Sequence, residues 1–429
     1  MRGLAAAWVI TGLPGEAPIE GGAVVLDAES RVVAVGTEQA LRAAHADARW
    51  ERHEAVLTPG LVNAHVHLEL SALRGETKSG GGFGPWAASM MARRAVLQPE
   101  DDAEAIEAGV SELLRAGTAA IGDISNTLRS VPALTGVPLL GRVFHEIFGY
   151  APDAARTLGD AARAARAQVR DWPANLSHVL APHTLFTLHA DAVRALVAEA
   201  REAGVRTSLH LAEHAAEIAF LRDGTGPFAA FLAERGVPAG AFVPPGRAPV
   251  AYGAALGVLG PEVIAVHLCA ATRDELAAVA AAHMPAVLCP RSNLYIELKL
   301  PPLYDVLAVG LRPGLGTDSL ASNTTLDVLA EASALADRFP AADRGTLFSM
   351  ASWHGAEALG LSHRVGALKP GLSPGVLAFD LARPAGEHGS SARAPIVDDP
   401  LRHILRSPPP VRRVLARPSM PKRSLEEVP

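Results

Sequence analysis

The chain is poor in the residues that define several common classes of protein. It has 2 cysteines in 429 residues, Cys269 and Cys289, so a disulfide framework and a Cys-x-x-Cys metal motif are excluded. It has no stretch of about 18 uninterrupted apolar residues that would span a bilayer. The apolar run near the N-terminus is too short for a signal-peptide core. We therefore expect a soluble, cytoplasmic protein without a membrane partner.

Clustered positive charge is also missing. The formal net charge of -6 and the pI near 6.2 argue against a nucleic-acid partner. The basic residues between Arg412 and Arg423 are few and are interrupted by prolines. Apolar residues make up 49% of the chain, which at this length allows one large catalytic domain and a smaller one.

Short apolar runs alternate with helix-favouring segments between residues 58 and 365. Besides the run that leads to His65, the candidate strands are 119–123, 139–144, 178–181, 206–210, 263–267, 286–289 and 311–316. The candidate helices are 100–116, 153–170, 190–203, 214–222 and 272–283. Eight strands alternating with helices predict an α/β fold, a (β/α)8 barrel of the TIM type.

The two ends of the chain have a different texture, dominated by short strands and turns. Residues 1–57 include a hairpin pattern, and residues 366–417 contain two further strand patterns. We expect these ends to form one discontinuous, small β-sandwich domain beside the barrel. Residues 384–395 are expected to be a mobile loop and residues 418–429 a flexible tail.

Two histidines, His65 and His67, lie two residues apart on the first candidate strand. Alternate side chains of a strand point the same way, so both imidazoles can bind one metal ion. Catalytic groups of such barrels lie at the C-terminal ends of the strands. The later strand ends carry His183 after the fourth, His210 and Glu213 at the fifth, His267 at the sixth and Asp318 after the eighth.

This set of residues suits a hydrolytic metal centre. Three neutral imidazoles and one carboxylate match a borderline divalent ion, zinc first and iron(II) second, with a position left for water. Such an ion lowers the pKa of water from 15.7 to about 7. Asp318 could take the water's proton, Glu213 could carry a proton to the substrate, and His267 could hold and polarise the water.

Lysine is scarce, and this limits the number of metal ions. The four lysines are at positions 78, 299, 369 and 422. None lies on the fourth candidate strand, where two-metal barrel hydrolases commonly carry a carboxylated lysine. A lysine-bridged pair of metals is therefore excluded, and one ion is predicted. Each predicted ligand alone could be structural, but their convergence at one rim favours the metal site.

Together these motifs resemble the amidohydrolase superfamily. The matching segments are Pro59–Leu68, His210–Glu213, His267 and Gly316–Ser319. The resemblance implies metal ligation by His65, His67, His210 and Asp318. It also implies that Glu213 and His267 act around the bound water. The His-x-x-Glu form is similar to the deaminase branch, hydrolases of C–N bonds other than peptide bonds. In that branch the glutamate protonates a ring nitrogen, and hydroxide displaces the amine as ammonia.

Further segments are similar to the aminodeoxyfutalosine deaminases of menaquinone synthesis. They are His65–Ser71, Phe83–Trp86, His210–Phe228 and Cys289–Asn293. This resemblance implies deamination at C6 of an adenine nucleoside with a bulky 5′ group. The first candidate substrate is 6-amino-6-deoxyfutalosine. Adenosine, methylthioadenosine or adenosylhomocysteine deaminases, and chlorohydrolases or amide-ring hydrolases of the superfamily, are alternatives. A non-catalytic barrel is the alternative of a different class. Such barrels often self-associate, so a homodimer is also open.

Substrate contacts are expected from His183, Arg142, Trp86, Phe83 and Ser71. The resemblance suggests that His183 contacts the sugar; alternatively it is a rim histidine bonded to backbone. Arg142 could bind a carboxylate or hydroxyl of the 5′ group, or form a buried pair with Glu146. Residues 78–86 contain four glycines. They could form a lid whose aromatic side chains stack on the base, or a plain connector.

Overall fold

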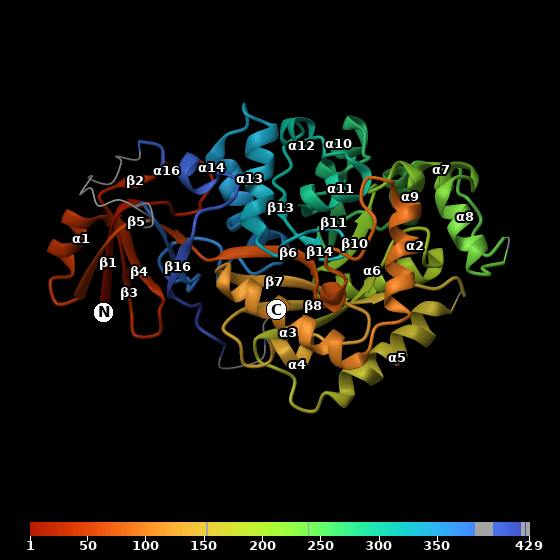
Figure 1. Cartoon of the computed structure of the whole chain (residues 1–429), viewed down its shortest axis with the longest axis horizontal. Coiled ribbons are helices and arrows are strands. Elements are labelled where there is room, and N and C mark those ends of the chain that lie inside the picture. Colours follow the sequence, from red (N-terminus) through yellow and green to blue (C-terminus); the bar gives the residue numbers. More distant parts are fainter. Residues whose placement is uncertain (152, 239, 382–397, 422–424, 426–429) are drawn as a thin grey trace.

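The strands of the described residues fall into three sheets. The computed structural model describes residues 1–151, 153–238, 240–381, 398–421 and 425. One seven-stranded sheet lies at one end of the molecule, and two parallel sheets of five and four strands occupy the rest, with helices around them (Figure 1). The predicted loop at 384–395 lies outside the described residues.

The seven-stranded sheet, which we call the end sheet, combines both ends of the chain. Its strands are β1 Arg2–Val9, β2 Ile19–Glu20, β3 Gly22–Leu26, β4 Val32–Thr37, β5 Arg49–Pro59, β15 Val376–Asp380 and β16 Arg412–Ala416. Strand β5 is parallel to β1 and antiparallel to β15, so it joins the two ends. The described residues of the two ends form this one sheet, where the sequence predicted a sandwich. Helix α1, Glu38–Ala44, packs against β3 and β4.

The other strands follow the predicted order and are all parallel. The first sheet runs β14-β6-β7-β8-β9 and the second β10-β11-β12-β13. Their bounds are β6 Leu61–His67, β7 Thr118–Ser125, β8 Leu140–Ile147, β9 Leu176–Pro182, β10 Thr207–Leu211, β11 Val263–His267, β12 Ala286–Leu288, β13 Gly314–Leu315 and β14 Asp318–Ser319. All eight predicted strands are confirmed, although the last is reduced to two short pieces.

The two parallel sheets meet edge to edge. Between β9 and β10, the Thr207 hydroxyl donates to the Leu180 carbonyl at 2.9 Å, and the His210 N–H donates to the His183 carbonyl at 3.0 Å. On the other side, β13 packs beside β6. A Cβ on Gly316 would lie only 2.6 Å from the Cβ of His65, so this approach requires glycine. The arrangement is of the TIM-barrel type.

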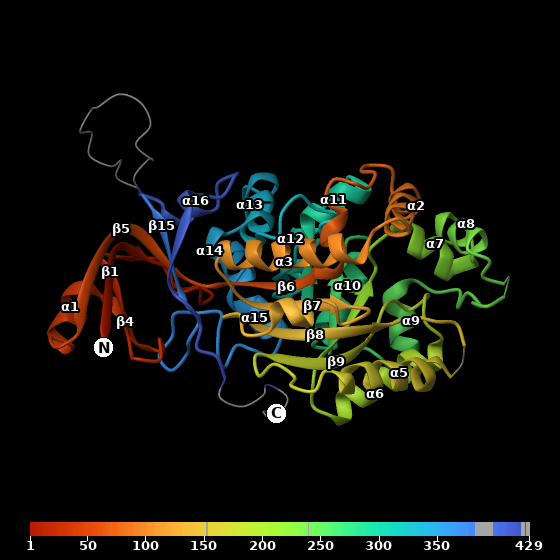
Figure 2. The same ribbon diagram turned by 60° about the horizontal axis from the view of Figure 1, so that its bottom comes forward.

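Helices cover the outer faces of the parallel strands. The predicted helices are confirmed as α3 Pro99–Arg115, α5 Ala154–Gln168, α6 Ala190–Glu202, α7 Ala215–Asp223 and α10 Arg273–Ala281. The remaining helices are η1 Leu68–Leu73, α2 Phe83–Arg94, α4 Val131–Leu134, α8 Pro227–Glu234, α9 Pro249–Leu256, α11 Pro290–Glu297, α12 Leu303–Ala308, α13 Val328–Arg338, α14 Arg344–Met350, α15 Trp353–Ala358 and α16 Pro400–Ile404. Figure 2 shows α5 and α6 beside β9.

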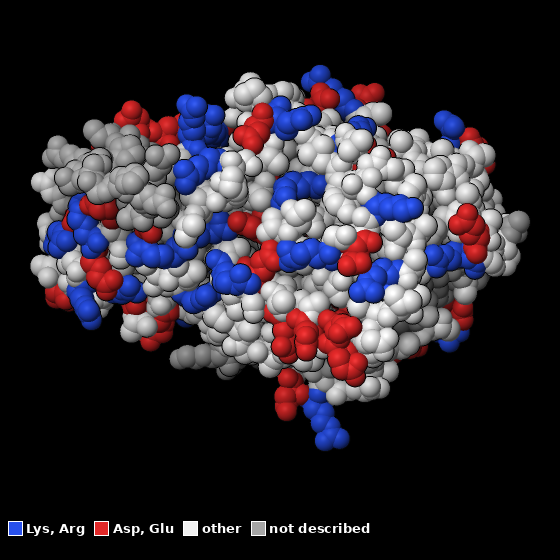
Figure 3. Space-filling view, in the orientation of Figure 1, with Lys and Arg blue, Asp and Glu red and all other residues white. Residues whose placement is uncertain are grey.

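Amphipathic spacing explains these outer helices. In α6, Val193, Leu196 and Val197 stand at positions i, i+3 and i+4 and are buried against the strands. The opposite side carries charged residues, and on the face drawn in Figure 3 basic and acidic side chains are interspersed. Among the described residues no helix is both long and apolar enough to cross a membrane.

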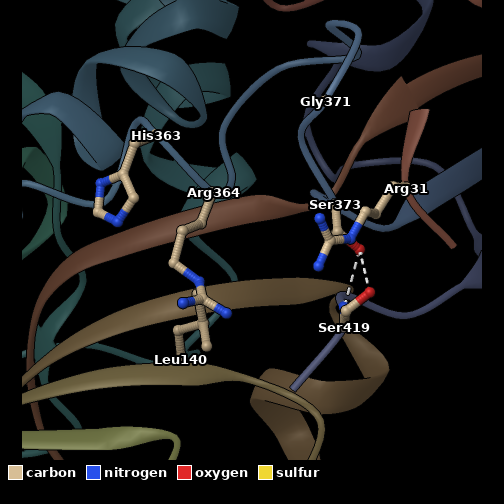
Figure 4. A pocket seen from close by; sticks show the side chains of 7 residues that line it. All are labelled: Arg31, Leu140, His363, Arg364, Gly371, Ser373 and Ser419. Carbon is tan, nitrogen blue, oxygen red and sulfur yellow. Dashed lines mark hydrogen bonds between the residues drawn. The ribbon is translucent and has the colours of Figure 1, made fainter. Parts of the chain in front are cut away.

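A crevice with a volume of about 200 Å³ lies where the end sheet meets the N-terminal ends of the parallel strands (Figure 4). Arg31 and Arg364 line it. In its wall the Ser419 N–H donates to the Ser373 hydroxyl at 2.8 Å. Leu425 is buried too. Ser419 and Leu425 of the predicted tail are therefore held against the body of the protein, and the flexibility of residues 418–429 stays a prediction.

A single residue, Gly60, joins the end sheet to the strand that carries His65. Strand β5 ends at Pro59 and β6 begins at Leu61. A Cβ on Gly60 would lie 2.5 Å from the Pro374 carbonyl oxygen and 2.8 Å from the Cβ of Ala119. The end sheet and the parallel strands can pack this closely because residue 60 has no side chain.

We predict that Gly60→Ala lowers the free energy of unfolding by about 1–3 kcal/mol, the usual cost of overpacking. Urea unfolding measures the change. The matched control is Gly36→Ala in β4, where an added Cβ would lie 3.8 Å from Leu41, an ordinary contact. Equal stability of the two variants would contradict the role of Gly60 in packing.

Candidate metal centre

Four side chains from different parts of the chain converge at the C-terminal ends of the parallel strands. His65 and His67 come from β6, His210 from β10 and Asp318 from β14. The Nε2 atoms of His65 and His67 are 3.2 Å apart. Asp318 Oδ1 lies 3.4 Å from His67 Nε2 and 3.9 Å from His65 Nε2. The rings of His65 and His210 have centroids 4.9 Å apart.

The spacing of the converging side chains fits a metal ion. Two nitrogens bound to one tetrahedral zinc at about 2.0–2.1 Å lie roughly 3.3 Å apart, close to the spacing of the two Nε2 atoms. Burial, followed by the charge of His210, holds the pKa of His65 well below its ordinary value. Burial likewise lowers the pKa of His67. Both imidazoles are therefore neutral, as metal ligands must be.

The ligands are oriented by groups around them. His210 Nδ1–H donates to the His183 carbonyl at 3.0 Å, which leaves its Nε2 for the ion. Asp318 Oδ2 accepts from the hydroxyls of Ser292 and Ser322. A reciprocal pair fixes the residue before Asp318, because Asn63 Nδ2–H donates to Thr317 Oγ1 at 2.8 Å and the Thr317 N–H donates to Asn63 Oδ1 at 3.1 Å.

The backbone is strained at these strand ends. The φ angles are 52° at Ala212, 78° at His267 and 57° at Asp318, in the left-handed region that non-glycine residues rarely adopt. Such conformations persist where surrounding contacts impose them, and they concentrate at functional sites. Here they turn the chain sharply just where the predicted site residues leave the strands.

Glu213 and His267 lie beside the four ligands. His267 Nε2 is 3.6 Å from Glu213 Oε2. One carboxylate oxygen from each of Glu213 and Asp318 and one nitrogen of His267 lie within 4.8 Å of one another. Burial lowers the pKa of His267 to about 4, despite the nearby carboxylates. Burial would raise the pKa of Glu213, but the charges of His214 and His267 and the hydrogen bond to His214 together outweigh it, lower the pKa and keep this carboxylate ionised.

Three of the predicted substrate contacts lie around this cluster. The His183 ring centroid is 5.0 Å from that of His210, and His183 Nδ1 is 2.7 Å from the Thr187 hydroxyl oxygen. The ring of Phe83 is 5.3 Å from that of His214. Trp86 Nε1–H donates to the Ala321 carbonyl at 2.9 Å, three residues beyond Asp318. Their contact with substrate stays a prediction.

The prediction that Arg142 contacts the substrate is wrong. Its guanidinium donates to the Leu359 carbonyl at the other end of β8, where burial lowers the pKa of Arg142 to about 10. The alternative, a buried ion pair between Arg142 and Glu146, is also wrong, because residues four positions apart on a strand lie about 13 Å apart. Glu146 instead faces the cluster, with Oε1 3.4 Å from His210 Nδ1.

The prediction that Ser71 contacts the substrate is wrong as well. Ser71 lies in η1 and is buried, and a Cβ on Gly109 of α3 would lie 2.8 Å from its hydroxyl oxygen. The Ser71 hydroxyl therefore faces α3, because the chain turns into η1 directly after His67 and carries this residue away from the strand ends.

Glu146 was not among the predicted site residues. It occupies the same end of its strand as the other site residues, so the strand-end rule alone could have identified it. Burial opposes its ionisation, but the charges of His183 and His210 hold the pKa of Glu146 below its ordinary value. Asn126 Nδ2–H donates to its other oxygen at 3.1 Å. Glu146 is thus a fixed, ionised acceptor next to His183.

Two buried carboxylates hold the backbone around the histidine pair. Asp123 Oδ1 accepts the N–H of Leu68 at 3.2 Å, and its Oδ2 accepts the Ser130 hydroxyl. Glu69 accepts the N–H groups of Asn126 and Arg129, each at 2.9 Å. The segment after His67 is therefore held by hydrogen bonds to and from β7 and the loop that follows it.

We predict that metal binding is lost in His65→Ala and kept in His183→Ala. Wild-type protein should carry about one ion per chain, and His65→Ala close to none, as measured by elemental analysis after dialysis. The control matters because Glu146, His183 and His210 also bring three ligand atoms within 4.8 Å of one another. If only His183→Ala lost the ion, the ion would be bound by Glu146, His183 and His210 instead.

We predict that Asp123 makes stability depend on pH. Burial raises the pKa of Asp123 from its ordinary 3.8 to about 7, so folding takes up a proton between these values and stability falls as pH rises through them. Asp123→Asn cannot ionise, yet it can accept from the Leu68 N–H and donate to the Ser130 hydroxyl. In metal-free protein, the unfolding free energy of Asp123→Asn should rise relative to that of the wild type between pH 4.5 and 8. Urea unfolding measures this difference. A constant difference would contradict this assignment.

The chain is similar to known proteins over most of its length. The sequence profile described as "Amidohydrolase family" matches residues 56–405. An aminodeoxyfutalosine deaminase of Deinococcus radiodurans is 32% identical over 365 residues, covering 82% of this chain and 84% of that protein. A 5-methylthioadenosine/S-adenosylhomocysteine deaminase of Nitratidesulfovibrio vulgaris is 29% identical over 395 residues, covering 88% and 84%.

The fold also matches a solved structure. The crystal structure of Helicobacter pylori aminofutalosine deaminase in complex with methylthio-coformycin superimposes with a TM-score of 0.79 and 23% identity, covering 89% of this chain and 93% of that one. The resemblance to amidohydrolases, and among them to adenine-nucleoside deaminases, is confirmed. With a family profile spanning most of its length and a relative at 32% identity, the chain belongs to the amidohydrolase family.

Proposed function

We propose that the protein is a one-metal aminohydrolase that replaces the C6 amine of an adenine nucleoside by oxygen and releases ammonia. The observation that carries this proposal is the convergence of His65, His67, His210 and Asp318, with Glu213 and His267 beside them. A divalent ion bound there, zinc first and iron(II) second, would bind and activate the attacking water.

The residues of this chain can carry out the proton transfers of such a reaction. Overall, the oxygen of water bonds to C6, the bond from C6 to the amine breaks, and the two water protons end on the ring nitrogen and on ammonia. Asp318 accepts the first proton. Glu213 is ionised between His214 and His267, so it must gain a proton before it can protonate the ring nitrogen. His267 Nε2 faces the same space and hydrogen-bonds the attacking oxygen.

The substrate would lie between His183 and α2. Phe83 and Trp86, on α2, offer aromatic faces for the base, and His183 contacts the sugar. Glu146, rather than Arg142, lies near this region. Its carboxylate is ionised and faces His183, where it can accept a hydrogen bond from a sugar hydroxyl. The 32% identity to an aminodeoxyfutalosine deaminase makes 6-amino-6-deoxyfutalosine, an intermediate of menaquinone synthesis, the first candidate substrate.

Methylthioadenosine and adenosylhomocysteine are the second candidate substrates. The relative from Nitratidesulfovibrio vulgaris, at 29% identity, is a deaminase of both. These nucleosides share the adenine base and differ in the 5′ group. The metal cluster would act on them equally, and the residues near His183 and Glu146 would decide between them.

We also propose that the two parallel sheets form one closed barrel within residues 58–365. The hydrogen bonds between β9 and β10 and the packing of β13 beside β6 support closure. Residues 1–57 and 366–417 would form the composite second domain. Because the site lies at the strand ends of the barrel, the end sheet would support β6 without contacting substrate.

Ammonia release from adenosine, methylthioadenosine, adenosylhomocysteine and 6-amino-6-deoxyfutalosine tests the proposal. We predict release from at least one of them, fastest from the last. Glu213→Gln should keep the metal but lose activity by about 10²–10⁴-fold, since it cannot transfer the proton. Activity retained by Glu213→Gln would exclude this role. Metal-loaded protein that releases no ammonia from any of the four would favour a dehalogenase or amide-ring hydrolase.

A further inference from the structure

We propose that Glu297 is a positioning residue that holds two parts of the site at once. It orients Glu213 through His214, and it anchors the N-terminus of α2, which carries Phe83 and Trp86. The first half rests on the proposed function, because it concerns the proton carrier. The second half concerns the structure alone and can be tested without any substrate.

The first link runs from Glu297 to Glu213. His214 Nδ1 lies 2.9 Å from Glu297 Oε1, and His214 Nε2 lies 3.2 Å from Glu213 Oε2. A carboxylate at each ring nitrogen requires both nitrogens to donate, so the ring is an imidazolium. Burial opposes that charge, but Glu213 and Glu297 together raise the pKa of His214 to about 10. His214 is thus clamped between the two carboxylates, and it fixes one oxygen of Glu213.

The second link runs from Glu297 to α2. Glu297 Oε1 also accepts the N–H of Phe83, the first residue of α2, at 3.2 Å. The residue before the helix is Gly82, whose missing side chain cannot cap it. The Glu297 carboxylate therefore supplies the cap from α11, and its negative charge suits the N-terminus of a helix.

Neighbouring contacts keep the segment before α2 against the end of α11. The N–H of Gly80 donates to the Tyr295 carbonyl at 2.7 Å, and the N–H of Gly82 donates to the Ile296 carbonyl at 2.9 Å. Phe83 then packs on the ring of His214, 5.3 Å between centroids, and on Phe228, 3.9 Å between centroids. Residues 80–83 therefore lie along the last turn of α11, next to the imidazolium.

One carboxylate oxygen thus connects the helix over the site to the proton carrier. If α2 moves away, Phe83 leaves both Glu297 and His214, and the clamp on Glu213 loosens. A substrate whose base packs on Phe83 or Trp86 would hold α2 in place and keep Glu213 oriented. A ligand too small to contact α2 would bind without fixing Glu213. This coupling would favour complete nucleosides over fragments.

Two variants of Glu297 separate its charge from its hydrogen bonds. Glu297→Gln keeps an oxygen that can accept from Phe83 and His214 but removes the negative charge. We expect kcat for ammonia release to fall about 10- to 100-fold, the loss of a charge-assisted hydrogen bond, with KM changed less than about threefold. Glu297→Ala removes both contacts, so kcat should fall at least as far and KM should rise as well.

The matched control is Glu112→Gln. Glu112 is also a helical carboxylate that holds a distant loop, because its Oε1 accepts the N–H of Leu326 at 2.8 Å and the hydroxyl of Thr325 at 2.6 Å. It lies in α3, and its hydrogen bonds within the described residues go to Arg74, Thr325 and Leu326, not to Glu213 or His214. A loss of stability similar to that of Glu297→Gln, with kcat unchanged, is expected.

Hydrogen exchange tests the anchor independently of catalysis. In Glu297→Ala, peptides covering residues 80–90 should exchange faster than in the wild type, whereas Glu112→Gln should leave them unchanged. Unchanged exchange in Glu297→Ala would overturn the anchoring role, and an unchanged kcat in metal-loaded Glu297→Ala would overturn the positioning role. If the wild type deaminates no nucleoside but the exchange result holds, the proposed function fails and the anchor stands.

Discussion

The site depends on the contact between β6 and the segment from β13 to β14. Asn63 and Thr317, 254 residues apart in sequence, exchange two hydrogen bonds there. Gly316 allows the backbone to approach His65 at a distance that no side chain would permit. Only because these strands touch can Asp318 reach the two histidines of β6. The position of Asp318 beside His65 and His67 follows from that closeness, whereas His210 and His267 reach the same place on β10 and β11.

Neutral and charged side chains occupy two separate regions around the cluster. Burial keeps the imidazoles of His65 and His67 neutral, so they are ready to bind an ion. Next to them, the paired carboxylates keep His214 charged and Glu213 ionised. The buried surroundings therefore produce opposite protonation states. His214 has a carboxylate at each ring nitrogen, whereas at His67 burial outweighs the attraction of Asp318. A metal ligand and a proton carrier need this difference.

Much of the fold could be predicted from the sequence, and so could most of the candidate site. Apolar runs and helical spacing identified all eight strands of the α/β part, and the strand-end rule placed His210, Glu213 and His267. The failures have a common cause. Arg142 is on the predicted strand but at its far end, and Ser71 follows the histidine pair but turns into η1 against α3. Hydrophobic periodicity identifies a strand, but it does not show which of its residues lie at the end that faces the site.

By itself the sequence determined the family, the donor types and the number of lysines, because each of these is a property of residue identity and spacing. It therefore limited the centre to imidazole and carboxylate ligands without a lysine bridge. Tertiary structure alone decided that a distant carboxylate holds the residue beside the proton carrier. Glu297 comes from α11 and reaches His214 only through packing. Contacts between segments distant in sequence leave no local pattern, so no reading of spacing could have paired Glu297 with His214.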